Sequence, residues 1–397
     1  RAGADALFDG WASGTASSVD ISARLAKAAQ LRRDLAHPVN DDDPMQSTRR
    51  KRSLTQQLDA VLADLRTMGD AVIAAGLLHG GKPGKALDNA YQALRTTVTD
   101  AFPAAGAPDR TNLDEVLQHG LTPTVPTDYE RWQPIHWPVE LADVFADQTG
   151  RRGGFDAIVG NPPFLTSKKI SPAMGFNLRQ WMVNVLADSR AGNADLCAYF
   201  FLRCGRLAKM AGTLGLLATN TIGQGDSREV ALDAMTSEGL EISRCVQSRP
   251  WPSKSANLEF AAVWATRADL GPKITRWVGE TPVSRISPLL EGVGRISGKP
   301  MRLAENRALA FIGANINGIG FVVDSVSAAD LLKDQSSSRV IRPYLGGEDL
   351  NSDPCGHASR WVIDFTGLSE EQAKLYPGPY GWLERHLKDY RSTLVAK

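Results

Sequence analysis

The most informative short stretch of the sequence is "FDAIVGNPPFL", residues 155–165. "FDAIVG" has the composition of a buried strand, and it runs directly into Asn161, Pro162, Pro163 and Phe164. Both prolines fix φ, and neither has a backbone N–H to donate. A strand that stops on these residues therefore ends in carbonyl and amide acceptors on a rigid turn, with an aromatic ring beside them.

This set of acceptors suits an exocyclic amino group. The side-chain carbonyl of Asn161 and the backbone carbonyl of Pro162 could accept hydrogen bonds from both N–H groups of an aromatic amine. These two hydrogen bonds would draw the lone pair of the amine nitrogen out of conjugation with the ring. The nitrogen would then be aimed at an electrophile by position and electrostatics, and no general base is needed to start the reaction. The alternative is an ordinary turn that ends a strand, with Phe164 in the core.

The surrounding residues 154–267 alternate between strand and helix patterns. The expected strands are "FDAIVG", "TLGLLAT", "LEISRCVQSR" and "LEFAAVWATR", and the expected helices are "ADLCAYFFLRCGRLAKMAG" and "DSREVALDAMTSEG". This order predicts an α/β fold with a mostly parallel sheet and helices on its faces. The carboxyl ends of the strands form the edge where such folds bind ligands, and the tetrapeptide follows one of them.

Composition and cysteine spacing restrict the class of protein. The balance of 45 Lys+Arg against 44 Asp+Glu indicates no particular partner. The chain has no run of 18 apolar residues and no signal-peptide pattern, so we expect a soluble, intracellular protein without a membrane partner. The four cysteines show no C-x-x-C and the six histidines no H-x-x-x-H, which predicts reduced, mostly buried thiols and no metal site.

Several linked motifs resemble one enzyme family. "NPPF" after "FDAIVG" resembles motif IV of the amino-group DNA methyltransferases that make N6-methyladenine from S-adenosylmethionine. Downstream, the segments similar to the motif V helix, the next strand and the aromatic hairpin are "ADLCAYFF", "GTLGLLATNT" and "RPWPSKSANLEFAAVWATR". "HWPVELADVF", "FIGANINGIGF", "IRPYLGGEDL" and "WVIDFTGLSEEQAKLYP" are similar to the large restriction-modification and phage-defence subgroup. The likeness covers roughly residues 135–390.

The resemblance implies a fold and a division into domains. The fold would be α/β, the C-terminal part of the sheet of a Rossmann-like S-adenosylmethionine-dependent methyltransferase. Residues 1–134 would be a helical insertion that ends in an irregular, proline-containing connector (residues 103–134), and residues 135–270 the catalytic domain. Residues 271–397 would begin a C-terminal α+β region that recognises the DNA target.

The resemblance also assigns roles to residues. The catalytic set would be Asn161, Pro162, Pro163 and Phe164, in which Asn161 and the Pro162 carbonyl hold the adenine N6 amino group. Phe164 would stack on the flipped base. Trp251, at the aromatic position of the hairpin, would close the other side of the base, although an ordinary half-buried aromatic residue explains it too.

Two positions would border the cofactor. Asp195 falls where the motif V residue lines the base and cofactor pocket, and Asn161 would be a second cofactor-binding residue. A helix N-cap or an acid in the first helical turn explains Asp195 equally well.

The sequence departs from the family pattern at the cofactor motif. The family places a Gly-rich loop after its first strand, and no such loop is found here. "DAVIAAGLLHGGKPGKAL", from Asp70, has helical surroundings and lacks the G-x-G core, and it fails as a phosphate loop as well. We therefore expect a truncated segment whose first strands lie upstream of Arg1, and which is unable to bind the cofactor alone.

The expected function is site-specific methylation of adenine N6 in double-stranded DNA, in the bacterial cytoplasm. Restriction or defence-system subunits would be further partners. One alternative is a methyltransferase that acts on a protein glutamine or another amine. The other is a catalytically idle module for DNA binding or assembly. The residues that follow the predicted fold, and Phe164 in place of a tyrosine, favour the DNA enzyme.

Overall fold

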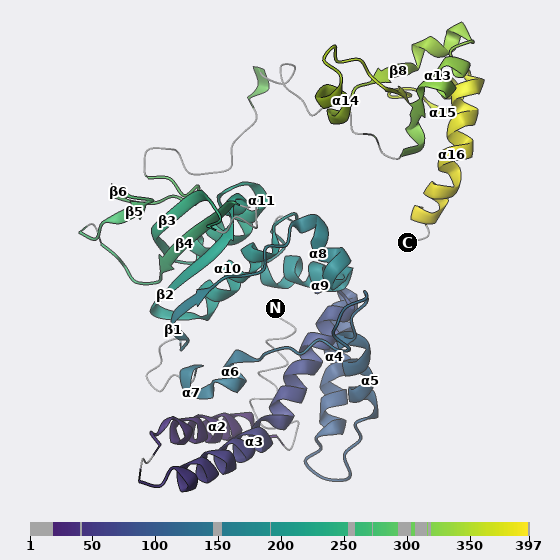
Figure 1. Ribbon diagram of the computed structural model, residues 1–397. Helices are drawn as coiled ribbons and strands as arrows, with labels where there is room; N and C mark the ends of the chain where they lie inside the picture. The colour runs from purple at the N-terminus through teal and green to yellow at the C-terminus, as the bar shows by residue number, and fades with distance from the viewer. Residues whose placement is uncertain are drawn as a thin grey trace. The chain divides into compact units, whose positions relative to one another are not determined.

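The computed structural model describes residues 19–39, 42–145, 153–190, 192–252, 259–271, 273–292, 303–305, 316 and 319–395. Figure 1 shows the chain, which divides into two compact units, residues 1–298 and 299–397. The expected division into three functional domains stays a prediction. No helix among the described residues combines the length and the apolar run needed to cross a membrane.

The first unit begins with a group of helices (Figure 1). They are α2 (Ile21–Ala36), α3 (Pro44–Leu78), α4 (Lys85–Ala101) and α5 (Thr111–Leu121). Asp43 precedes α3, and its carboxylate accepts a hydrogen bond from the Gln46 N–H at 2.9 Å, which satisfies a free donor of the first turn. Leu58, Leu62 and Leu65 of α3 recur at helical spacing and are buried, so this helix packs one apolar face into the core.

Helix α5 corrects the expectation of an irregular connector at residues 103–134. Leu113, Leu117 and Leu121 repeat every four residues along it, and all three are buried in the helical core. Prolines flank this segment on both sides, and prolines end helices without preventing a short one between them. The proline content therefore obscured a helix whose stability comes from tertiary packing.

Gly120 of α5 allows a close crossing with α3. A Cβ atom placed on Gly120 would lie 2.4 Å from the carbonyl oxygen of Ala74. Helix propensity alone would make Gly120→Ala stabilising by about 0.5–1 kcal/mol. We instead expect a loss of about 1–3 kcal/mol in urea unfolding, because the methyl group meets backbone. Gly381→Ala in a helix of the second unit, where the Cβ meets nothing within 4 Å, is the control and should not destabilise. Equal effects of the two changes would contradict the close crossing.

Two short helices connect this group to the sheet, α6 (Trp137–Glu140) and α7 (Ala142–Phe145). Arg66 of α3 donates two hydrogen bonds of 2.7 Å to the carboxylate of Glu140. The rings of Trp137 and Phe145 each meet the Phe155 ring edge-on, with centroids 5.4 Å apart. These contacts fix the start of the first strand against the helices.

The sheet of this unit has the strand order β1-β2-β4-β3-β5-β6. The strands are β1 (Phe155–Gly160), β2 (Ala208–Thr219), β3 (Glu241–Pro250), β4 (Glu259–Thr266), β5 (Arg276–Val278) and β6 (Thr281–Val283). β1 is parallel to β2 and β3 to β5, whereas β4 is antiparallel to both of its neighbours and β6 to β5. The α/β class is confirmed, and the sheet is mixed rather than mostly parallel in its pairings.

The helices between strands are grouped on one face of the sheet. They are α8 (Ser167–Met174), α9 (Phe176–Trp181), the π-helix η1 (Met182–Leu186) and α10 (Leu196–Leu207), followed by η2 (Asn220–Gly223), α11 (Gly225–Arg228), η3 (Glu229–Asp233) and α12 (Ala234–Ser237). α10, η3 and α12 share one core with β2, β3 and β4. The connections from β1 to β2 and from β2 to β3 both move across the sheet in the same direction. Right-handed crossovers therefore place the helices of both connections on the same face. On the other face, Val159 is 88% and Trp264 40% exposed.

The start of β2 corrects a third expectation. The helix expected to continue to Gly212 ends at Leu207, and β2 begins at Ala208. The β1–β2 register jumps between the pairs Phe155–Ala208 and Ala157–Thr213, so the intervening residues form an irregularity of the ladder. Pairing with β1 therefore overrides the helical pattern of "AKMAG".

The second unit is an α+β unit, as expected for its residues. Its sheet has the antiparallel order β7 (Val322–Asp324), β9 (Arg360–Ile363) and β8 (Ile341–Tyr344). The helices are η5 (Ile319–Phe321), α13 (Ser325–Leu331), η6 (Gln335–Arg339), α14 (Gly347–Ser352), α15 (Glu370–Ala373) and α16 (Pro377–Val395). Most of "GANINGIGF" lies outside the described residues.

Candidate active site

The tetrapeptide from Asn161 to Phe164 follows β1 directly, at the carboxyl end of the strand. Gly160 pairs with Leu216, so the tetrapeptide runs beside the end of the parallel strand β2. Pro162 is buried, Phe164 is half-buried, and Asn161 is exposed. The Asn161 side chain makes no hydrogen bond to another described residue. The turn therefore keeps a polar amide available at the edge where the sequence places the chemistry.

Hydrogen bonds on its C-terminal side hold this turn. The backbone carbonyl of Leu165 accepts from the Leu196 N–H at 2.9 Å, and the Leu165 side chain packs on the core. The Ser167 N–H, at the start of α8, donates to the Asp195 carboxylate at 3.0 Å. The start of α10 thus fixes the residues that follow the tetrapeptide, and the prolines fix the tetrapeptide itself.

Asp195 is the centre of a buried hydrogen-bond network. Its side chain is almost fully buried, and besides Ser167 it accepts from the Thr221 hydroxyl at 2.8 Å and from the Thr219 hydroxyl at 3.2 Å. Its backbone N–H donates to the Ser227 hydroxyl at 3.0 Å. Asp195 occupies the N-cap position of α10, yet its side chain does not cap that helix. The carboxylate instead ties α8 to the residues that follow β2.

The partners of Asp195 in this network were not singled out from the sequence. They are the Ser167 N–H and the hydroxyls of Thr219, Thr221 and Ser227. The one signal for them was the polar end "TNT" after the second strand. Because Asp195 already accepts three hydrogen bonds, it positions the site, and its contact with the cofactor stays a prediction.

Trp251 follows β3 at the same edge of the sheet, because β1, β2 and β3 run in the same direction. The Trp251 ring meets the Phe260 ring edge-on, with centroids 5.4 Å apart. Phe260 pairs in turn with Thr219 at the end of β2. The half-buried Trp251 is therefore linked through strand β4 to Thr219 of the Asp195 network. The role of Trp251 in stacking on the base stays a prediction.

Glu259 adds a negative charge near this edge. Its carboxylate accepts hydrogen bonds from the Ser248 hydroxyl at 2.5 Å and the Asn220 amide at 3.1 Å. These two donors hold the pKa of the Glu259 carboxyl below its usual range. Glu259 therefore remains ionised at neutral pH and orients Asn220 beside the end of β2.

The three cysteines of the first unit do not provide a nucleophile. Burial raises the pKa of the Cys197 and Cys204 thiols, and raises that of Cys245 to about 12. A thiol with a raised pKa forms little of the reactive thiolate. Cys355 is exposed and belongs to the second unit.

The glycines of "HGGKPG" form a turn between α3 and α4. Gly80 and Gly81 have φ values of 56° and 60°, which favour glycine. A Cβ on Gly81 would lie 2.3 Å from a methyl carbon of Val185. These glycines therefore allow a tight helix–helix connection, which confirms the helical surroundings expected for them.

A cavity of about 910 Å³ lies away from the tetrapeptide, between the helical group and α10. Trp181, Tyr199 and Phe200 line it, together with apolar residues of α3 and of residues 132–139. None of the residues 161–164 contributes to its wall. The cavity is therefore separate from the proposed chemistry.

Comparison with known proteins identifies the family. The family model of the Eco57I restriction-modification methylase matches residues 41–240, just over half of the chain. The chain belongs to this family. The matched residues include the helical group from α3 onward, the tetrapeptide and Asp195, whereas Trp251 and the second unit lie outside them. The expectation of a restriction-modification methylase is thereby confirmed.

One similar solved structure is that of the Type IIL restriction-modification enzyme MmeI in complex with DNA. The sequences are 15% identical, with a TM-score of 0.45, and the match covers 76% of this chain and 40% of the MmeI chain. The matched part of this chain thus spans less than half of that enzyme. No curated protein matches the sequence.

Proposed function

We propose that this chain is part of a DNA methyltransferase that transfers a methyl group from S-adenosylmethionine to adenine N6, in a restriction-modification or phage-defence system. One observation carries the proposal. Asn161 stands at the carboxyl end of β1 as an exposed amide without a side-chain partner among the described residues, next to a rigid Pro-Pro turn. The chain that presents it belongs to a methylase family.

The residues of the turn have separate tasks in this proposal. The Asn161 side-chain carbonyl and the Pro162 backbone carbonyl accept the two N–H bonds of the amine, so its lone pair points toward the methyl donor. Phe164 stacks on the base, which has left the double helix, and Trp251 closes its other side. S-adenosylmethionine, when bound, supplies an electrophilic methyl group on a positively charged sulfur.

The described residues fit the amine better than they fit the cofactor. They contain no Gly-rich loop after a strand beside β1, which would hold the cofactor in a fold of this kind. β1 is the edge strand of the described sheet. We therefore assign the cofactor loop to a further segment that pairs with the free edge of β1. Assays of this proposal require the full-length protein.

The proposed partner is double-stranded DNA, read by the second unit, with restriction or defence-system subunits as further partners in the bacterial cytoplasm. Two lysines support the DNA assignment. Lys168 and Lys169 follow the tetrapeptide on α8, are exposed, and form no ion pair within the described residues. Cations beside a flipped base are suited to hold the phosphates of the target strand.

We expect the Lys168→Gln, Lys169→Gln double variant to bind DNA more weakly without losing cofactor affinity. Each phosphate contact that is lost should reduce the slope of log affinity against log salt by about 1. The control is the Lys82→Gln, Lys85→Gln variant at the α3–α4 turn, where both lysines are also exposed. If the slope of log affinity against log salt were unchanged in the Lys168→Gln, Lys169→Gln variant, these lysines would not contact the DNA.

Labelled methyl transfer tests the proposed function. The full-length protein is incubated with methyl-labelled S-adenosylmethionine, with DNA and, separately, with a cell extract freed of nucleic acids. We expect label in the DNA alone. Label only in protein would favour the alternative of a protein amide methyltransferase, and no label in either would favour an idle DNA-binding or assembly module.

A further inference from the structure

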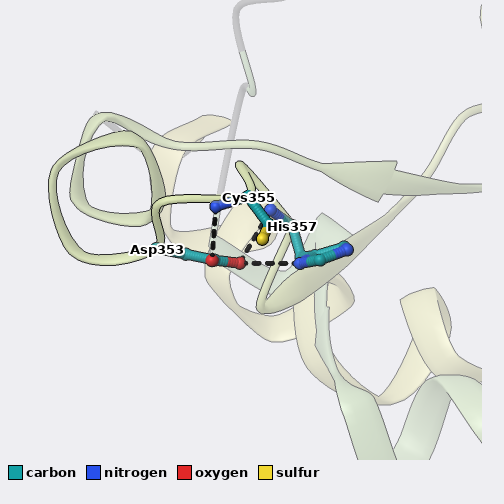
Figure 2. A group of neighbouring side chains, drawn as sticks. All are labelled: Asp353, Cys355 and His357. Atoms are coloured by element: carbon teal, nitrogen blue, oxygen red, sulfur yellow. Dashed lines mark hydrogen bonds and ion pairs between the residues drawn. The ribbon is translucent and has the colours of Figure 1, made fainter.

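A turn in the second unit brings three possible metal ligands together. Residues 353–357, "DPCGH", connect the end of α14 to β9. The Asp353 carbonyl accepts from the Gly356 N–H at 3.0 Å, and Gly356 has a φ of 65°, a value that favours glycine. Pro354 fixes φ at the second position of the turn. The turn is therefore rigid, and Figure 2 shows the side chains of Asp353, Cys355 and His357 converging on one side of it.

The three side chains supply a mixed set of donor atoms. One carboxylate oxygen, one sulfur and one imidazole nitrogen all lie within 4.8 Å of one another. Of these atoms, Asp353 Oδ2 and His357 Nδ1 lie 2.9 Å apart. A tetrahedral ion with ligand bonds of about 2.0–2.3 Å fits among such atoms after small side-chain rotations.

The electrostatics of the turn favour a cation. The backbone N–H groups of Cys355 and His357 each donate to the Asp353 carboxylate at 2.9 Å, which fixes its orientation in the turn. The nearby Asp349 carboxylate adds a second negative charge. Asp353 also stands at the C-terminal end of α14, where free carbonyl groups attract positive charge. A bound ion would replace the direct contact between His357 Nδ1 and Asp353 Oδ2.

We propose that this turn binds one zinc ion through Asp353, Cys355 and His357, with water as the fourth ligand. Thiolate and imidazole ligands select zinc over magnesium and calcium, which prefer oxygen. Cys355 and His357 are exposed, so the ion enters directly from solvent. The ion cross-links the turn that precedes β9. This inference is independent of the proposed methyltransferase function.

Cobalt and zinc titrations of the metal-free 397-residue chain test the site. We expect one equivalent of Co²⁺ to produce a thiolate-to-cobalt charge-transfer band and the visible bands of a tetrahedral ion, and Zn²⁺ to displace it. Cys355→Ser should abolish the charge-transfer band. His357→Gln and Asp353→Asn should each weaken Zn²⁺ binding by about 10-fold or more in calorimetry.

The control is His119→Gln, which removes another exposed histidine beside a carboxylate, that of Glu115 at 4.0 Å. It should leave Zn²⁺ affinity unchanged. Circular dichroism checks that each variant is folded, and the charge-transfer band of the wild-type chain reports sulfur ligation without any variant. A spectrum without that band, or equal Zn²⁺ affinity in wild type and Cys355→Ser, would overturn the site.

Discussion

Asn161→Ala in the full-length protein is expected to reduce the rate of methyl transfer to DNA by about 10²–10³-fold, the usual effect of removing one preorganised electrostatic contact to a reacting group. Asn161 is exposed and makes no side-chain hydrogen bond to another described residue. Its loss should therefore leave stability almost unchanged. Single-turnover transfer of labelled methyl, together with urea unfolding, measures both effects.

Asn89→Ala provides the matched control, because Asn89 is an exposed asparagine on α4, outside the proposed site. It should leave the rate of transfer unchanged. If Asn161→Ala transferred methyl groups to DNA as fast as the Asn89→Ala control, the acceptor mechanism would be wrong.

Asp195→Ala is expected to have the largest effect on stability, a loss of about 2–4 kcal/mol for the first unit. The change leaves the Ser167 N–H and the hydroxyls of Thr219 and Thr221 without the carboxylate that they share. Asp195→Asn keeps the shape and one acceptor, so we expect a smaller loss of about 1–2 kcal/mol. Urea unfolding measures both variants, and Asp88→Ala on the exposed side of α4 should cost no more than about 0.5 kcal/mol.

A double-mutant cycle separates a positioning role for Asp195 from direct cofactor contact. Adding Asp195→Ala to the Thr219→Val, Thr221→Val variant should cost less unfolding free energy than adding it to the wild type. The reason is that two of the hydrogen bonds of Asp195 are already absent from that variant. Strictly additive losses would contradict the network. An Asp195 variant that kept full stability but lost affinity for the cofactor would instead support direct contact between Asp195 and the cofactor.

The strands and the position of the chemistry could be predicted from local patterns. β1, β3 and β4 stand where their apolar residues indicate, and β2 covers its predicted core. Strand direction and helix placement follow chain connectivity, so the edge that carries Asn161 could be predicted as well.

The rest depends on contacts between distant residues. The helix that ends at Leu207 and the strand that begins at Ala208 have one continuous helical pattern, and only pairing with β1 separates them. α5 depends on burial of Leu113 and Leu117 in the helical core. The Asp195 network joins side chains from three segments of the chain, which no local spacing specifies.

The identity of the methylated nucleoside shows whether the turn after β1 acts on the amino group of adenine. DNA treated with the full-length protein and labelled S-adenosylmethionine is digested to nucleosides and analysed by mass spectrometry. If the turn after β1 holds an adenine amino group, the label appears in N6-methyladenine and is lost with Asn161→Ala. Label in C5-methylcytosine would contradict the proposed role of the turn, because carbon C5 carries no amino group that could donate hydrogen bonds to Asn161 and Pro162.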